Sequence, residues 1–342
     1  MTSSGPYLPW QQAWQQALYG DQGFYRRPEG PAGHFRTACH AAAPVLAGAL
    51  AALATEAGCS AIVDVGAGRG ELLTALADAE AAAGLRLHGV DVVERPDGLP
   101  ERIGWSAGLP DLPDGALDGA LVTAWELLDV VPMPIAEVGK DGGLRLVLVE
   151  PATGDERPGP PLTALESSWC ARWWPGVDAE PGSRVEIGAP RDALWAGLVK
   201  RVARTSTGGL LLAVDYRHDV ERRPAEGSLA AFRSGRAVPP VPDGSCDLTA
   251  HVALDAVAVA GEFAGASASV LLRQREALRA RGVAITPGDL ATARSAGTAA
   301  LLAQLERRSQ LDELLDANGL GGFGWLVQGV RRPVPAALLR HT

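Results

Sequence analysis

A glycine-rich turn between a strand and a helix is the first place in the sequence where chemistry could take place. The stretch AIVDVGAGRGELLTAL, residues 61–76, contains Gly66, Gly68 and Gly70. A dinucleotide-binding turn has the pattern G-x-G-x-x-G, and Glu71 stands where that pattern has its third glycine. The Glu71 carboxylate would lie close to a pyrophosphate, which is unfavourable. The sequence also has no P-loop pattern, so the turn favours a ligand other than these phosphate-bearing nucleotides.

The glycines continue an acidic-x-Gly-x-Gly-x-Gly pattern that begins at Asp64. This pattern resembles motif I of class I S-adenosylmethionine (SAM) methyltransferases. SAM carries an ammonium and a sulfonium but no phosphate, so a nearby acid favours it. Asp91 ends the next predicted strand, where a carboxylate can accept hydrogen bonds from both ribose hydroxyls. The alternatives are an NAD site, a tight turn without a ligand, and a solvated charge at Asp91.

Two carboxylates, Glu126 and Asp129, follow the fourth predicted strand. They lie at the carboxyl edge, where open α/β sheets bind ligands, and a spacing of three residues places them on one side of a turn or helix start. Paired carboxylates could hold a guanidinium bidentately, since that group arrives charged. They could equally bind an amine, or cap a helix whose N-terminus favours acids.

Further polar residues follow the fifth predicted strand and an extended segment near residue 250. Asp215 and Tyr216 end the strand, where a tyrosine can bind a polar ligand or simply belong to the core. Asp247, Thr249 and His251 alternate, so in an extended segment they share a face. His251 could accept a proton released after transfer, or be structural.

Four separate stretches resemble one family, the MidA-like methyltransferases, which includes a mitochondrial complex I assembly factor that methylates a protein arginine. GHFRTACHAAAP is similar to GDFxTAPEISP, AWELLDVVPM to ANExxDAxPV, GGLLLAVDYR to GxxLxIDYG, and CDLTAHVAL to xDITAHVDF. The matches occur in the family's order. They imply SAM as the cofactor, with Thr37 in a loop that covers it. Departures from the pattern, including Trp125 in place of Asn, leave the family's substrate in question.

Strands alternate with helices from residue 61 onward, which indicates an α/β fold: a Rossmann-like methyltransferase core with a mostly parallel sheet and helices on both faces. We predict a helical N-terminal segment at 1–55, a core at 56–135 and 190–342, and an inserted subdomain at 136–189. The insert contains a hairpin pattern with DGG as its turn, a proline-rich stretch and a patch of Trp169, Trp173 and Trp174. This patch could be a partner surface or the insert's own core. Residues 218–247 are predicted to form a long ordered loop.

Composition excludes several classes of function. The formal charge of −9 argues against nucleic acid as a partner, and the four cysteines are too dispersed for a metal site. They suit a reducing cytoplasm, and the longest apolar stretch, 41–54, is too short for a membrane span. We therefore expect a cytoplasmic SAM-dependent methyltransferase whose acceptor is either an arginine of a protein or a small nucleophilic molecule. The alternative is a SAM-binding assembly factor or scaffold without turnover, and the oligomeric state stays open.

Overall fold

The computed structural model describes residues 6–27, 38–175, 180–283, 292 and 294–340. It groups the chain into two compact units. The first unit comprises Met1–Phe35, Glu126–Lys200 and Asp215–Gly265, and the second comprises Arg36–Trp125, Arg201–Val214 and Ala266–Thr342. These borders differ from the sequence-based division at residues 55, 135 and 189, so that three-part division stays a prediction.

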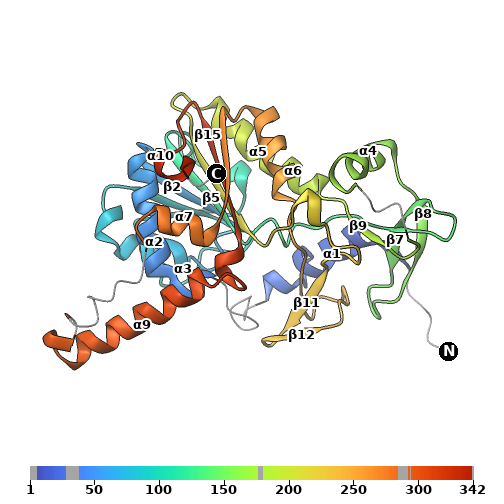
Figure 1. Cartoon of the computed structure of the whole chain (residues 1–342), viewed down its shortest axis with the longest axis horizontal. Coiled ribbons are helices and arrows are strands. Elements are labelled where there is room, and N and C mark those ends of the chain that lie inside the picture. The colour runs from blue at the N-terminus through green and yellow to red at the C-terminus, as the bar shows by residue number, and fades with distance from the viewer. Residues whose placement is uncertain (1–5, 28–37, 176–179, 284–291, 293, 341–342) are drawn as a thin grey trace. The chain divides into compact units, whose positions relative to one another are not determined.

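The second unit is an α/β fold, in which helices such as α2 and α7 accompany a central sheet (Figure 1). The sheet has seven strands in the order β14-β15-β10-β5-β2-β3-β4. The strands from β10 to β4 run parallel, and β14 pairs antiparallel with β15, as the predicted fold class requires for its core. Its strands and helices in chain order are α2 (Ala38–Glu56), β2 (Ala61–Val65), α3 (Glu71–Asp78), β3 (Arg86–Val90), β4 (Ile103–Ser106), β5 (Ala120–Trp125), β10 (Gly209–Asp215), β14 (Ala268–Arg273), α7 (Gln274–Ala280), α9 (Thr298–Leu315), β15 (Gly324–Val330) and α10 (Ala336–Leu339).

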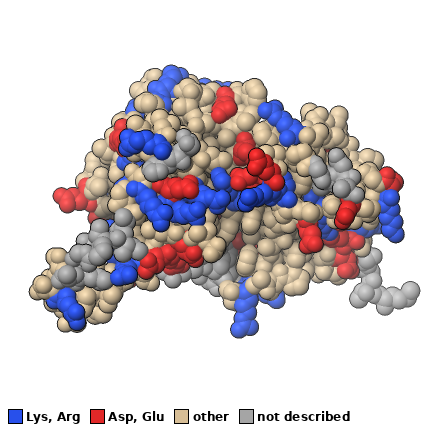
Figure 2. Space-filling model, viewed as in Figure 1, with Lys and Arg blue, Asp and Glu red and all other residues tan. Residues whose placement is uncertain are grey.

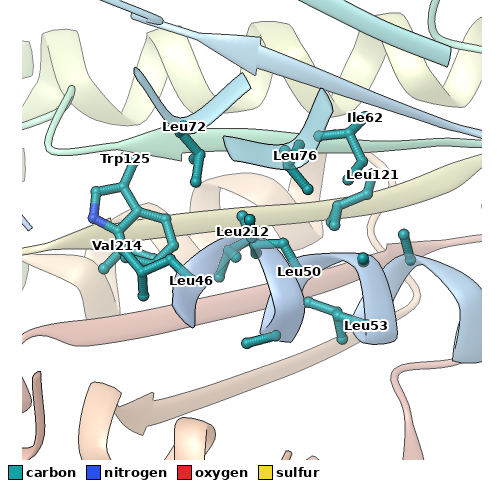
Figure 3. Close-up of a cluster of buried hydrophobic side chains, with 14 of the residues drawn as sticks. Leu46, Leu50, Leu53, Ile62, Leu72, Leu76, Leu121, Trp125, Leu212 and Val214 are labelled. Carbon is teal, nitrogen blue, oxygen red and sulfur yellow. The ribbon is translucent and has the colours of Figure 1, made fainter. Parts of the chain in front are cut away.

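The central strands are apolar because both of their faces are covered. Every residue of β2, β5 and β10 is buried, which is typical of a parallel sheet between helices. Figure 3 shows leucines of α2 and α3 packed against side chains of these three strands. α2 contains Pro44, and the backbone leaves helical geometry two residues earlier, at Ala42. A proline removes one helical hydrogen bond and clashes with the preceding turn, so it accounts for this kink.

The first unit contains two antiparallel sheets. β1, β7, β6 and β9 form one of them in that order, with β8 paired to β7, and β12, β11 and β13 form the other. Its strands and helices in chain order are β1 (Leu8–Pro9), α1 (Trp10–Tyr19), β6 (Ile135–Val138), β7 (Leu144–Val149), β8 (Glu156–Pro161), α4 (Ala164–Trp173), β9 (Arg184–Glu186), α5 (Ala189–Arg204), whose last turn belongs to the second unit, β11 (Ala230–Arg233), β12 (Arg236–Val238), β13 (Asp247–Thr249) and α6 (Leu254–Ala264).

The predicted hairpin of this unit is confirmed. β6 and β7 form the expected hairpin, and Gly142 in its turn has a φ of +76°. β8 carries three prolines and, among the described strands, pairs only with β7. It is therefore an edge strand, and edge strands tolerate residues without an N–H donor.

The prediction of a loop over residues 218–247 is wrong, because β11 and β12 form a hairpin within it. Arg233 and Arg236 pair across the two-residue turn Ser234-Gly235, in which φ is +50° and +75°. Positive φ at both turn positions is the geometry that matches the twist of a hairpin. The strands have only four and three residues, which is too short for a recognisable alternation of apolar and polar residues among the surrounding prolines and glycines.

Surface features bear on which partners the chain could have. None of the described helices is both long and apolar enough to cross a membrane. Figure 2 shows basic and acidic side chains interspersed on the face it displays.

Candidate functional site

The glycine-rich turn connects β2 to α3 in the second unit. Gly66, Gly68 and Gly70 have φ values of +78°, +58° and +79°, a region that side-chain-bearing residues rarely adopt. Gly70 is the N-cap residue of α3, and a Cβ atom there would lie 2.5 Å from Cδ1 of Leu99. The backbone of this turn therefore requires glycine at the predicted positions.

Asp91 directly follows β3 and is bonded to the glycine turn. Its Oδ2 accepts a hydrogen bond from the amide of Gly68 at 2.8 Å, and its Oδ1 accepts one from the amide of Val93 at 3.2 Å. Burial raises the pKa of Asp91, against the lowering effect of the Gly68 hydrogen bond. The carboxylate is thus held in a fixed orientation beside the turn.

Asp64 lies in β2, one residue before the strand ends. Its side chain is buried, and its Oδ1 accepts a hydrogen bond from Oγ1 of Thr123 on β5 at 2.6 Å. Burial raises the pKa of Asp64 to about 7, and the neighbouring carboxylates of Asp91 and Glu71 raise it further, while the Thr123 hydrogen bond lowers it. A cationic group bound beside Asp64 would favour its ionised form.

These residues fit a ligand with a ribose and a cationic amino-acid group. A Cβ atom built on Gly68 would meet no protein atom closer than 3.6 Å, where Oε2 of Glu71 lies, so a ligand can approach the backbone there. Asp91 and Asp64 place carboxylates beside this turn, and carboxylates are acceptors suited to ribose hydroxyls and to an ammonium. Thr37, predicted to cover the cofactor, lies outside the described residues.

Glu126 and Asp129 belong to the first unit and are placed by the segment that follows β5. Glu126 has a φ of +50°, which is unusual for a residue with a side chain and is common at functional sites. The carboxylate of Asp215 accepts hydrogen bonds from the amides of Leu128 at 2.9 Å and Asp129 at 3.1 Å. Asp215 therefore fixes the turn that carries the two carboxylates, and its own contact with a substrate stays a prediction.

Asp129 is 5% exposed, and only one of its two carboxylate oxygens accepts a hydrogen bond among the described residues. Its Oδ2 accepts a hydrogen bond from Oγ1 of Thr249 at 2.6 Å, whereas its Oδ1 has no hydrogen-bond partner among the described residues. A buried carboxylate oxygen without a donor is costly, so this atom marks a place where a ligand donor would be stabilised.

Asp247 adds a third buried carboxylate to this unit. Its Oδ1 accepts a hydrogen bond from the hydroxyl of Tyr25 at 2.9 Å. Burial and the charge of Asp129 raise the pKa of Asp247 to about 8. The same two causes raise the pKa of Asp215 well above its ordinary value. We call Asp129, Asp215 and Asp247 the carboxylate cluster.

Arg191, in the first turn of α5, is the buried cation that acts on this cluster. Its guanidinium donates hydrogen bonds to four backbone carbonyls: those of Asp129 at 2.6 Å, Val131 at 3.2 Å, Ala250 at 3.0 Å and His251 at 2.8 Å. The donors of Arg191 are thus used to join two chain segments. Burial raises the pKa of both Asp129 and Asp215, and the positive charge of Arg191 offsets part of that rise.

Tyr216 and His251 stack on each other beside the cluster. Their ring centroids lie 5.6 Å apart with an interplanar angle of 14°. Burial and the positive charge of Arg191 lower the pKa of His251, which keeps its imidazole neutral at neutral pH. Burial and the charges of Glu126, Asp129 and Asp215 raise the pKa of Tyr216, so its hydroxyl stays protonated.

Sequence reasoning missed Arg191 and Tyr25. Arg191 lies in the first turn of α5, where the helix macrodipole disfavours a cation. A cation at such a position indicates that nearby acceptors stabilise it, and this was the one signal in the sequence that could have identified Arg191. Tyr25 pairs with a residue 222 positions away, for which the sequence carries no local signal.

No group of three or more His, Cys, Asp and Glu residues suited to holding a metal occurs in the part of the chain that the structure describes.

Comparisons with known proteins identify a family and two similar crystal structures. Residues 45–271 match a family described as "Putative S-adenosyl-L-methionine-dependent methyltransferase". A crystal structure from Burkholderia thailandensis bound to S-adenosyl-homocysteine superposes with a TM-score of 0.78, at 24% identity, over 98% of this chain and 91% of that one. A native crystal structure of an uncharacterised protein from the same organism superposes with a TM-score of 0.76, at 24% identity, over 98% of this chain and 91% of that one. At this identity the likeness establishes the fold. No curated protein matches the sequence.

Proposed function

Because the chain belongs to this family of S-adenosyl-L-methionine-dependent methyltransferases, we propose that it transfers the methyl group of SAM to a nitrogen of a cationic acceptor, a guanidinium of a protein arginine. The proposal assigns SAM to the glycine turn with Asp64 and Asp91, and the acceptor to Glu126, Asp129 and the residues around them. When bound, SAM supplies a methyl group on a positively charged sulfur.

The observation that carries the choice of acceptor is the unpartnered Oδ1 of Asp129. Asp129 belongs to the carboxylate cluster, in which all three side chains are buried. The hydrogen bonds of the buried Arg191 guanidinium go to backbone carbonyls and not to this oxygen. A guanidinium has up to five donors in a planar fork and stays charged at all relevant pH values. Such a group would supply the missing hydrogen bond and a second positive charge beside the cluster.

His251 is the residue we assign to the proton. Methyl transfer to a guanidinium forms a nitrogen–carbon bond, breaks the sulfur–carbon bond and releases one proton from the nitrogen. A neutral imidazole can accept that proton, and the lowered pKa of His251 keeps it neutral. Tyr216 stacks on its ring and holds the ring orientation.

The test is methyl transfer by two charge-neutralising variants, Glu126→Gln and Asp129→Asn. Purified protein is incubated with methyl-labelled SAM and a lysate, and the labelled residue is identified. Losing a charge-assisted hydrogen bond costs on the order of 1.5–3 kcal/mol, so we expect each variant to transfer label at least about tenfold more slowly. SAM affinity is expected to stay within a few-fold of wild type. The exposed Glu221→Gln is the matched control.

The results for methyl transfer and SAM affinity distinguish the possible roles of Glu126 and Asp129. Unchanged transfer by both variants would contradict a cationic acceptor. A loss of SAM affinity that matches the loss of transfer would move the carboxylates into the cofactor site. Label on a residue other than arginine would reject the proposed acceptor, and a wild-type protein that binds SAM without transferring label would support a scaffold.

A further inference from the structure

Trp125 is the one tryptophan of the second unit whose indole nitrogen has no hydrogen-bond partner among the described residues. Its side chain is 5% exposed. The other two indoles of this unit are paired: Nε1 of Trp105 donates to the carbonyl of Val93 at 3.1 Å, and Nε1 of Trp325 donates to Oε1 of Gln274 at 3.1 Å. A buried N–H donor without an acceptor costs free energy, so the exception at Trp125 needs a reason.

The position of Trp125 suggests that reason. It is the last residue of β5, and β5 pairs with β2 so that Thr123 lies opposite Asp64. Alternate residues of a strand point to the same face, which places the indole of Trp125 on the same face as Thr123 and Asp64. Figure 3 shows the indole at the edge of the apolar cluster, with its nitrogen on the side away from the labelled leucines.

The order of the strands indicates which part of the cofactor this face would meet. β2, which carries the glycine turn, lies between β3 and β5. Asp91 follows β3 and is the proposed ribose ligand, so the nucleoside lies toward β3. The methionyl end of the same molecule then lies toward β5, which ends at Trp125 and whose Thr123 is bonded to Asp64 of β2. A zwitterionic amino-acid group needs an acceptor for its ammonium and a donor for its carboxylate.

We propose that the indole N–H of Trp125 donates a hydrogen bond to the carboxylate of the methionyl group of SAM. This inference rests on the proposed function and names a residue that selects the intact amino-acid end of the cofactor. Trp125 stands where the family pattern in the sequence has Asn, so an indole donor takes the place of an amide. The edge-to-face contact with Trp325, with centroids 5.6 Å apart at 85°, orients the ring.

The test compares two ligands by calorimetry: SAM, and decarboxylated SAM, which lacks only the carboxylate. For Trp125→Phe we expect the affinity for SAM to fall roughly ten- to a hundredfold, as for the loss of a charge-assisted hydrogen bond. The affinity for decarboxylated SAM should stay within about threefold of wild type. Trp169→Phe is the control, because Trp169 lies in the first unit and its indole N–H already has a protein acceptor, Oδ2 of Asp192 at 2.7 Å.

A second variant protects the test against a folding defect. Trp125→3-benzothienylalanine keeps the bicyclic ring and replaces only the N–H with sulfur, and we expect the same selective loss. Equal losses for the two ligands, or no loss for SAM, would overturn the assignment of Trp125. A wild-type protein that binds neither ligand would overturn the proposed function as well, which distinguishes the two failures.

Discussion

Gly68 combines two properties at the scale of a single residue. Its φ of +58° excludes most side chains, and its amide donates to Asp91, so the turn and the end of β3 are held together through one peptide. A residue with a side chain at this position would both strain the backbone and place atoms where a ligand is proposed to lie.

We predict that Gly68→Val abolishes SAM binding. A matched control separates ligand exclusion from backbone strain. Gly98 has a φ of +79°, and a Cβ atom there would meet nothing within 4 Å. Gly98→Val should therefore cost stability by a similar amount, more than about 1 kcal/mol, and leave SAM affinity unchanged. Calorimetry and urea unfolding measure the two quantities. Retained SAM binding in Gly68→Val would remove this turn from the cofactor site.

At the scale of elements, α5 organises the carboxylate cluster through Arg191. Its four carbonyl acceptors lie 59 to 62 residues away in the sequence, in the segment after β5 and the segment after β13. A planar guanidinium can serve acceptors in several directions at once, which an ammonium cannot do.

We predict that Arg191→Lys destabilises the protein by about 3 kcal/mol or more, because it leaves buried carbonyls without donors and buried carboxylates with a poorly placed cation. Arg204→Lys, at the exposed end of the same helix, should change the free energy of unfolding by less than about 0.5 kcal/mol. Urea unfolding of both variants provides the measurement. Similar stability of the two variants would show that Arg191 does not hold these segments together.

Some elements could be predicted from the sequence because the residues that determine them are close together in the chain. The strand, glycine turn and helix at 61–78 follow from local residue types, and α1 buries Trp10, Trp14 and Leu18 on one face as their spacing indicates. The positions of Asp64 and Asp91 at strand ends follow from those elements. The partners of Asp129, Asp215 and Asp247 do not, since each hydrogen bond joins residues at least 86 positions apart. The β11–β12 hairpin was missed because its short strands lack a periodic pattern.

At the scale of the whole molecule, the buried carboxyl groups make stability depend on pH. The pKa of Asp247 is raised to about 8, so between its ordinary value and pH 8 the folded protein holds a proton that the unfolded chain releases. Its contribution to stability is therefore lost as pH rises toward 8. His218, whose pKa burial lowers to about 3, acts in the opposite direction below its ordinary value, so the effect of Asp247 is best resolved above pH 6.5.

We predict that the free energy of unfolding of the ligand-free protein falls as pH rises from 6.5 to 7.5, and that Asp247→Asn makes this slope shallower by about 1 kcal/mol per pH unit. The control is Asp243→Asn, an exposed carboxyl on the same segment, which should keep the wild-type slope. Urea unfolding at several pH values tests this. A slope that Asp247→Asn leaves unchanged would mean that Asp247 is ionised in the folded protein at neutral pH.

The central claim is that the glycine turn with Asp64 and Asp91 holds SAM and not a dinucleotide. The most direct measurement is calorimetric titration of the purified wild-type protein with SAM and, separately, with NAD. We predict saturable binding of SAM and much weaker binding of NAD, because Glu71 stands where a dinucleotide turn has its third glycine. Tighter binding of NAD than of SAM would contradict it.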